Sequence, residues 1–249
     1  MLNGLYINDV ILSKPIERTS YLYDIPSVNY LINNHKISFQ KKVTFFVGEN
    51  GTGKSTFLEA IAVAFGFNAE GGTKNFSFST NQSHSELWKH ITLSKSKIAK
   101  DGFFLRAESF YNFASKIDQM DSEPSFGALI IDSYGGVSLH EQSHGESFLA
   151  LVQNRFGGNG VYILDEPEAA LSPMRLLTLL AEINELTKRN SQFIIATHSP
   201  ILMTYPDAEI LEFSQKGIQS VGYKDTEHYQ ITRRFLENPE QIYKYLFEE

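Results

Sequence analysis

Short apolar runs alternate along the chain with segments of helical periodicity. Strands are predicted at Leu5 to Leu12, Lys36 to Phe39, Val43 to Val47, Phe103 to Ala107, Ala128 to Asp132, Val161 to Leu164, Phe193 to Ala196 and Glu209 to Phe213. Helices are predicted to begin at Lys54, Ser109, Gly145, Pro173 and Thr226, and a last one at Pro239 with Asn238 as its cap. This alternation predicts an α/β domain with a mostly parallel sheet covered by helices on both faces.

Composition narrows the class of protein. The 249 residues are 42% hydrophobic, contain no cysteine and carry a formal net charge of −7. A chain of this length buries enough surface to fold without disulfides. The lack of cysteine excludes cysteine-ligated zinc, iron–sulfur clusters and a cysteine nucleophile. We expect one domain over residues 1–249, located in the cytoplasm and not inserted in a membrane, since no leader pattern or apolar run of about 18 residues occurs.

Two polar regions interrupt this pattern. Segment 71–101 is rich in Ser, Asn and Lys and is predicted to be an insertion or lid, and residues 225–249 are predicted to form C-terminal helices. The negative net charge argues against a surface that binds nucleic acid throughout. The densest basic cluster is interpreted as a solvated face, with a DNA contact as the alternative; it consists of Lys89, His90, Lys95, Lys97 and Lys100.

The most specific motif is a phosphate-binding loop. It matches G-x-x-x-x-G-K-[ST], behind an apolar strand and ahead of a helical pattern, with Gly48, Glu49, Asn50, Gly51, Thr52, Gly53, Lys54, Ser55 and Thr56. In such a loop, backbone N–H groups and a helix N-terminus face the phosphates of a nucleotide. Lys54 is expected to reach the β- and γ-phosphates, and the Ser55 hydroxyl to bind Mg²⁺.

Polar side chains also follow two of the other predicted strands. The run Val161 to Leu164 leads into Asp165 and Glu166, at the strand end where a parallel sheet presents ligand-binding side chains. We expect Asp165 to hold Mg²⁺ and Glu166 to orient or deprotonate the attacking water. Another apolar strand is followed closely by His198, which is predicted to contact the γ-phosphate and that water.

A fourth motif begins the helix that precedes the acidic strand. Ser143, Gly145 and Glu146 lie at its start, where a hydroxyl and free N–H groups can meet a second phosphate. The order of phosphate loop, Ser-x-Gly-Glu helix start, Leu-Asp-Glu-Pro and strand-end His resembles the ATP-binding-cassette (ABC) ATPases, whose signature is L-S-G-G-Q. The resemblance implies a head-to-tail dimer closing on two ATP molecules. In that dimer the signature meets the γ-phosphate of the opposite subunit, residues 169–172 face the partner and His198 is the switch histidine.

The sequence departs from the ABC pattern in two places. His144 replaces the second-position Gly of the signature, and the segment 103–109 lacks the Gln that ABC proteins place beside Mg²⁺ and the attacking water. Glu108 is the candidate for that place. Tyr21 and Tyr23 both stay open as aromatic partners of adenine, with ordinary packing as the alternative for either.

Within the ABC-like proteins the chain is similar to soluble SMC-like and RecF-like ATPases, and closest to compact standalone bacterial AAA/ABC-like ATPases. The stretch between Lys54 and Asp165 is too short for a long antiparallel coiled coil, and the residues after Phe213 are too few for a nuclease domain. We predict a Mg²⁺-dependent ATPase that acts as a homodimer on an unidentified protein or nucleic acid. The alternatives are the energising subunit of a membrane transporter and a nucleotide-gated binding module with slow hydrolysis.

Overall fold

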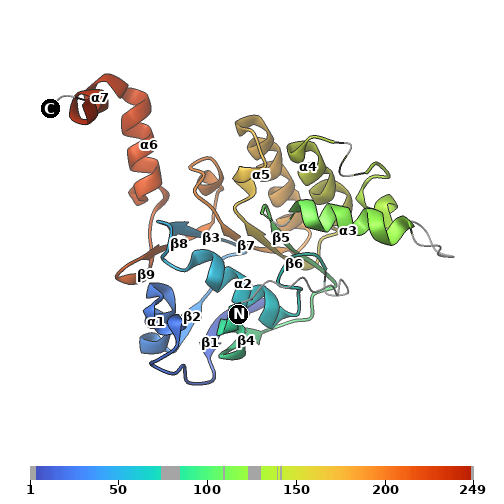
Figure 1. Cartoon of the computed structure of the whole chain (residues 1–249), viewed down its shortest axis with the longest axis horizontal. Coiled ribbons are helices and arrows are strands. Elements are labelled where there is room, and N and C mark those ends of the chain that lie inside the picture. Colours follow the sequence, from blue (N-terminus) through green and yellow to red (C-terminus); the bar gives the residue numbers. More distant parts are fainter. Residues whose placement is uncertain are drawn as a thin grey trace.

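The computed structural model describes residues 4–73, 85–108, 110–122, 130–138, 140 and 142–247. Within these residues the main sheet has six strands, in the order β5 (Asp101–Arg106), β6 (Gly160–Asp165), β7 (Gln192–Ala196), β3 (Val43–Gly48), β8 (Glu209–Ser214) and β9 (Gly217–Ser220) (Figure 1). Neighbours from β5 through to β8 are parallel, and β9 runs antiparallel to β8. The predicted, mostly parallel sheet is confirmed.

A smaller antiparallel sheet contains β2 (Lys36–Ser38), β1 (Ile7–Leu12) and β4 (Ile91–Lys95), with β1 in the centre. The buried amide of Gln192 on β7 joins the two sheets. It accepts hydrogen bonds from the N–H groups of Tyr6 and Ile7 at 2.8 and 2.9 Å, and it donates to the carbonyl oxygen of Ile7 at 2.9 Å. The small sheet is therefore fixed against the strand that leads to His198.

Helices cover both faces of the main sheet, as predicted. The α-helices in the described residues are α1 (Pro26–Asn34), α2 (Lys54–Phe65), α3 (Phe110–Ser122), α4 (His144–Arg155), α5 (Pro173–Lys188), α6 (Glu227–Glu237) and α7 (Pro239–Phe247). The small sheet, α1 and α2 lie on one face, and α3, α4 and α5 lie on the other (Figure 1). Because successive strand residues point to opposite faces, Phe46 of β3 belongs to the first core and Phe45 to the second.

One predicted strand is wrong. In the stretch Ala128 to Asp132, residues 128 and 129 lie outside the described residues, and Ile130–Tyr134 forms a 3₁₀ helix. The carboxylate of Asp121 accepts hydrogen bonds from the N–H groups of Ile130 and Ile131 at 2.7 and 2.8 Å. The Asp121 carboxylate thus caps the first backbone N–H groups of the helical turn. In a strand, the same N–H groups would have needed a neighbouring strand as their hydrogen-bond partner.

The described part of segment 71–101, predicted to be an insertion or lid, contributes a strand to the small sheet. Its residues 91–95 form β4, in which Ile91 and Leu93 are buried while Thr92 between them is exposed. The segment ends on Asp101, the first residue of β5. Residues 74–84 lie outside the described residues. The short alternation of β4 was missed because Ser and Lys residues surround it in the sequence.

Helix starts agree with the sequence to within about one residue. α2 and α5 begin at Lys54 and Pro173 as predicted, whereas α4 begins at His144, one residue before the predicted start. The predicted start at Ser109 lies outside the described residues, and α3 begins at Phe110.

The two C-terminal helices extend away from the body of the molecule (Figure 1). α6 begins after its cap Thr226, whose hydroxyl accepts a hydrogen bond from the N–H of Tyr229, and α7 begins at Pro239. In the part of the chain that the structure describes, no helix is both long and apolar enough to cross a membrane.

Candidate active site

The phosphate-binding loop connects β3 to α2 and has a backbone that demands glycine. Gly48, Gly51 and Gly53 adopt φ angles of 126°, 81° and 93°. A Cβ atom on Gly48 would lie 2.0 Å from the carbonyl oxygen of Phe213, and one on Gly53 would lie 2.3 Å from the Ser27 hydroxyl oxygen. The loop therefore folds against β8 and α1 at distances that no side chain would allow.

Lys54 lies inside this loop. Its Nζ donates hydrogen bonds to the carbonyl oxygens of Gly48 and Glu49 at 2.7 and 2.8 Å, and the residue is only 5% exposed. Burial lowers the pKa of the ammonium group, and the carboxylates of Glu166 and Asp165 oppose that effect. The lysine is therefore a cation at the floor of the loop, directly beside the acidic strand end.

Ser55 and Asp165 meet across the sheet edge, as the sequence predicted. The Ser55 hydroxyl donates a hydrogen bond to Asp165 Oδ1 at 3.2 Å. Burial raises the pKa of Asp165 to about 6, although nearby Arg106 and the Ser55 hydrogen bond lower it. The chain thus holds a poorly solvated carboxylate and a hydroxyl oxygen side by side, the oxygen donors that a hard divalent cation prefers.

Arg106 is a site residue that sequence reasoning missed. It lies on β5 in register with Asp165 on β6, with its Nε 3.5 Å from Asp165 Oδ2 and its Nη1 2.8 Å from Glu59 Oε2. Glu108, the predicted substitute for the missing Gln, lies farther out: its side chain is 87% exposed, and its Oε2 is 3.8 Å from Arg106 Nη2. An arginine at the end of a predicted strand was the available signal.

Glu166 and His198 form a second pair at the same edge. Glu166 follows β6 in the left-handed region, with φ 50° and ψ 53°, and its N–H donates to the carbonyl oxygen of Ala196 at 2.9 Å. Its Oε1 is 3.5 Å from His198 Nε2. The sequence placed both residues at this edge, and the structure brings their side chains together.

Two further residues hold His198 in place. The carboxylate of Glu168 accepts hydrogen bonds from the His198 backbone N–H and from the Thr197 hydroxyl, the latter at 2.8 Å. On the other side, His198 Nδ1 lies 2.8 Å from Nε2 of His228, in the first turn of α6. Periodicity and spacing gave no sign of the contact with His228, which joins two segments 30 residues apart.

The predicted signature residues lie at the start of α4 and are bonded to one another. The backbone N–H and the hydroxyl of Ser143 both donate to Glu146 Oε2, at 3.0 and 2.6 Å. Arg175 of α5 donates to Ser143 Oγ at 3.2 Å and to Glu146 Oε1 at 2.9 Å. A Cβ atom on Gly145 would lie 2.4 Å from Arg175 Nη1. The contacts described for this segment are thus with α5 and the loop before it.

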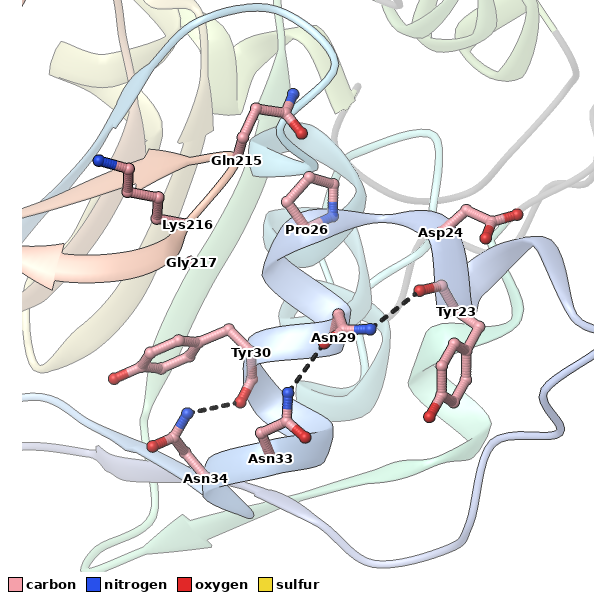
Figure 2. A pocket seen from close by; sticks show the side chains of 10 residues that line it. All are labelled: Tyr23, Asp24, Pro26, Asn29, Tyr30, Asn33, Asn34, Gln215, Lys216 and Gly217. Atoms are coloured by element: carbon pink, nitrogen blue, oxygen red, sulfur yellow. Dashed lines mark hydrogen bonds between the residues drawn. The ribbon is translucent and has the colours of Figure 1, made fainter.

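The loop itself has a hollow of about 180 Å³, lined by residues of the phosphate-binding motif together with Ile25 and Glu166. A larger hollow of about 560 Å³ lies next to it, between α1 and the β8–β9 turn (Figure 2). Tyr23 lines this second hollow, at the end opposite Lys216, whereas the hydroxyl of Tyr21 lies 3.5 Å from Ser85 Oγ. The side-chain amide of Asn29 donates a hydrogen bond to the carbonyl oxygen of Tyr23, and both residues line this second hollow (Figure 2).

The sheet order explains which predicted residues converge. Lys54 and Ser55 follow β3, Asp165 and Glu166 end β6, and His198 follows β7, which lies between those two strands. No group of three or more His, Cys, Asp or Glu side chains suited to a metal ion occurs among the described residues.

Comparison with known proteins indicates the same class. An AAA domain model matches residues 27–121, and a second model, described as "AAA domain, putative AbiEii toxin, Type IV TA system", matches residues 83–204. The "Retron Vc95 probable ATPase" of Vibrio cholerae serotype O1 biovar El Tor is 30% identical over 119 residues, covering 41% of this chain and 23% of that protein. The ribose import ATP-binding protein RbsA of Bacillus cereus is 24% identical over 172 residues, covering 63% of this chain and 34% of that protein.

Among solved structures, an ATP-binding cassette of an ABC transporter matches 97% of this chain and 99% of its own length, with a TM-score of 0.51 at 15% identity. That likeness shows the fold. The chain spans about a quarter to a third of the length of the two curated relatives. The two AAA domain models and the shared fold support an ABC-type P-loop ATPase, the class that the sequence resembles.

Proposed function

We propose that this chain binds Mg²⁺-ATP at the phosphate-binding loop and hydrolyses it at composite sites of a head-to-tail dimer. The observation that carries the proposal is the convergence of three pieces at one sheet edge: the buried Lys54, the Ser55–Asp165 pair and the Glu166–His198 pair. Their residues come from the ends of β3, β6 and β7, and together they supply a cation for phosphate, oxygen donors for a metal and a group that can accept a proton.

Mg²⁺ fits the donor set because Ser55 Oγ and Asp165 Oδ1 lie 3.2 Å apart on a rigid edge. When bound, the ion would neutralise charge on the phosphates and favour the ionised form of Asp165, whose burial disfavours it. Lys54 would leave the carbonyl oxygens that it now contacts and donate to phosphate oxygens, which are stronger acceptors. The loop N–H groups complete an anion site at the start of α2.

Glu166 is the proposed general base. Its side chain is 41% exposed, so a water molecule can reach it, and it faces His198 at 3.5 Å. A carboxylate in this place can accept a proton from water attacking a phosphate, while the imidazole N–H contacts the phosphate or the water.

The dimer is proposed from the signature. Ser143, Gly145 and Glu146 lie at a helix start on the layer formed by α4 and α5, and their described contacts are with Arg175. A second copy, turned head to tail, would bring these donors to the γ-phosphate held by Lys54 of the first. Such closure could drive or gate action on a protein or nucleic-acid partner, and we place the protein in the cytoplasm.

The test combines turnover and assembly. Glu166→Gln should bind Mg²⁺-ATP with unchanged affinity and hydrolyse it roughly a hundredfold or more slowly, because the amide cannot accept a proton. In sedimentation velocity this variant should be dimeric with Mg²⁺-ATP and monomeric without it. Lys54→Ala is the binding control and should show no dimer at the same ATP concentration.

Adding Ser143→Arg to Glu166→Gln should prevent the dimer and leave ATP binding intact, because the bulky side chain blocks closure on the signature side. A Glu166→Gln protein that keeps more than about a tenth of the wild-type turnover would remove Glu166 as the base. Nucleotide-dependent dimers that survive Ser143→Arg would remove the signature from the interface.

A second candidate is the energising subunit of a membrane transporter, which the similarity to RbsA favours. A transporter subunit depends on its membrane partner for full activity. Turnover of the isolated chain that is too slow to measure over hours would favour this alternative or a nucleotide-gated binding module.

A further inference from the structure

His228, in the first of the two C-terminal helices, contacts His198 at the catalytic edge. It occupies the second position of α6, and its Nε2 lies 2.8 Å from Nδ1 of His198, with the ring centroids 4.9 Å apart. Both rings are partly buried. Glu166 lies on the opposite side of His198, so three side chains form a row: His228, His198, Glu166.

The row fixes which nitrogen of His198 carries the proton. Burial and the nearby Lys54 lower the pKa of both rings, so both are neutral near pH 7.5. Two neutral rings 2.8 Å apart share one proton between the facing nitrogens. If His198 Nδ1 carried it, Nε2 would turn a lone pair toward the Glu166 carboxylate, which is repulsive. If His228 Nε2 donates instead, His198 Nε2 carries a proton and faces the carboxylate favourably.

The first turn of α6 is what holds His228 in place. Thr226, its cap, is fully buried, and its hydroxyl donates to the carbonyl oxygen of Tyr223 at 2.8 Å. The rings of Tyr223 and Tyr229 pack with centroids 4.6 Å apart. Beyond this turn the helix has no buried residue and borders a largely apolar hollow of about 410 Å³ that includes Ile201 and Leu236. The first turn of α6 therefore both anchors the helix and holds His228 against His198.

We propose that His228 is a positioning residue for ATP hydrolysis: its Nε2–H donates to Nδ1 of His198 and holds His198 in the tautomer whose Nε2–H points toward Glu166 and the γ-phosphate site. The inference rests on the proposed function, because it assigns His228 a role in that reaction. His228 itself touches neither the phosphate loop nor Asp165 in the described contacts. A consequence is that hydrolysis depends on the seating of α6, although nucleotide binding does not.

The kinetic test compares three variants of the full chain. His228→Ala removes the donor and should lower kcat about tenfold or more, with KM for Mg²⁺-ATP changed less than about threefold. His228→Gln places an amide N–H near the position of the imidazole Nε2 and should restore kcat to within about threefold of wild type. Arg234→Ala, at an exposed position of the same helix, is the control and should match the wild type.

A spectroscopic readout separates positioning from general damage. In ¹⁵N-histidine-labelled protein without nucleotide, His198 should carry its proton on Nε2 in the wild type and in His228→Gln. In His228→Ala it should populate both tautomers. The ring ¹⁵N resonances of His198 and of His228 are assigned by their disappearance in His198→Gln and in His228→Gln.

The outcomes distinguish this inference from the proposed function. If the wild type hydrolyses ATP and His228→Ala retains full kcat, the role of His228 is overturned and the proposed ATP hydrolysis stands. The same holds if His198 carries its proton on Nδ1. Loss of activity in His228→Ala that His228→Gln does not restore would also overturn it. A wild-type protein without turnover, but with His198 protonated on Nε2, would overturn the proposed reaction and leave the tautomer assignment standing.

Discussion

Replacing Asp165 by Asn should make the nucleotide-free protein more stable at neutral pH. Burial raises the pKa of this carboxyl group from its ordinary value of 3.8 to about 6. At roughly 1.4 kcal/mol for each pKa unit, keeping Asp165 ionised in the folded state costs about 3 kcal/mol at pH 7 and above. Asn has the same shape, can accept the Ser55 hydrogen bond and carries no charge that must be desolvated.

The pKa of about 6 already includes the attraction of Arg106, which lowers it, so about 3 kcal/mol is the net penalty. The gain is smaller than this penalty because the Asn amide does not reproduce every contact of the carboxyl group. We therefore expect a net gain of about 1–2 kcal/mol in the free energy of unfolding. For a domain of this size, that corresponds to a rise in Tm of roughly 2–8 °C. The same substitution should abolish Mg²⁺-dependent hydrolysis, so stability and activity change in opposite directions.

The pH dependence identifies the cause. Because the folded state binds the Asp165 proton more tightly than the unfolded state, the wild type carries no penalty below about pH 3.8 and loses stability as the pH rises through about 6. The advantage of Asp165→Asn should therefore be small near pH 4.5, grow through pH 6 and level off above pH 7. Where either protein is acid-denatured, the comparison starts at the lowest pH at which both fold.

The assay is thermal and urea unfolding in EDTA without nucleotide, from pH 4.5 to 8. Asp132→Asn, the same change at an exposed position of the 3₁₀ helix after α3, is the control and should show no pH-dependent advantage. An Asp165→Asn protein less stable than the wild type at pH 8, or a difference that does not vary with pH, would refute the reasoning.

Two further predictions concern the framework around the site. Gly48→Ala should cost about 3 kcal/mol or more, because its Cβ would meet the Phe213 carbonyl oxygen at 2.0 Å, whereas Gly51→Ala, with nothing within 4 Å, should cost only about 1 kcal/mol for its positive φ. Equal losses of the two variants in urea unfolding would contradict this difference. Gln192→Leu should cost about 2–4 kcal/mol, because it leaves the buried backbone groups of Ile7 that now bond to the amide without partners. A loss under about 0.5 kcal/mol by the same measurement would show that the two sheets are joined mainly by apolar packing.

The predictable part of the fold was the part that is buried on both faces. Strands β3, β6 and β7 are continuous apolar runs because helices or strands cover both sides of them, and their bounds were predicted within one residue. Helix α1 was missed because it is rich in Asn and polar on its outer side, with Val28 and Leu31 supplying its buried contacts. Strand β9 has four residues at a sheet edge and depends on its pairing with β8, which no local pattern shows.

The candidate site divides in the same way. Residues that end a buried strand or begin the helix behind it, such as Ser55, Asp165 and His198, could be placed at one edge by the rule that parallel strands end together. Arg106 and His228 could not, because a strand-end arginine has many uses, and a helix near the end of the chain can dock anywhere. Their positions depend on sheet order and on the path of the chain after β9, which are properties of the whole fold.

The backbone at Glu166 shows how the fold aims one side chain. A left-handed conformation costs a non-glycine residue about 1 kcal/mol, and Glu166 adopts it with φ 50° and ψ 53°. The conformation persists because the Glu166 N–H is bonded to Ala196 on β7 while Pro167 next to it begins a 3₁₀ turn. The left-handed conformation keeps the Glu166 backbone hydrogen-bonded to the end of β7 and directs its carboxylate toward His198. Since Gln would adopt the same strained backbone as Glu, Glu166→Gln tests proton transfer without changing the geometry that positions it.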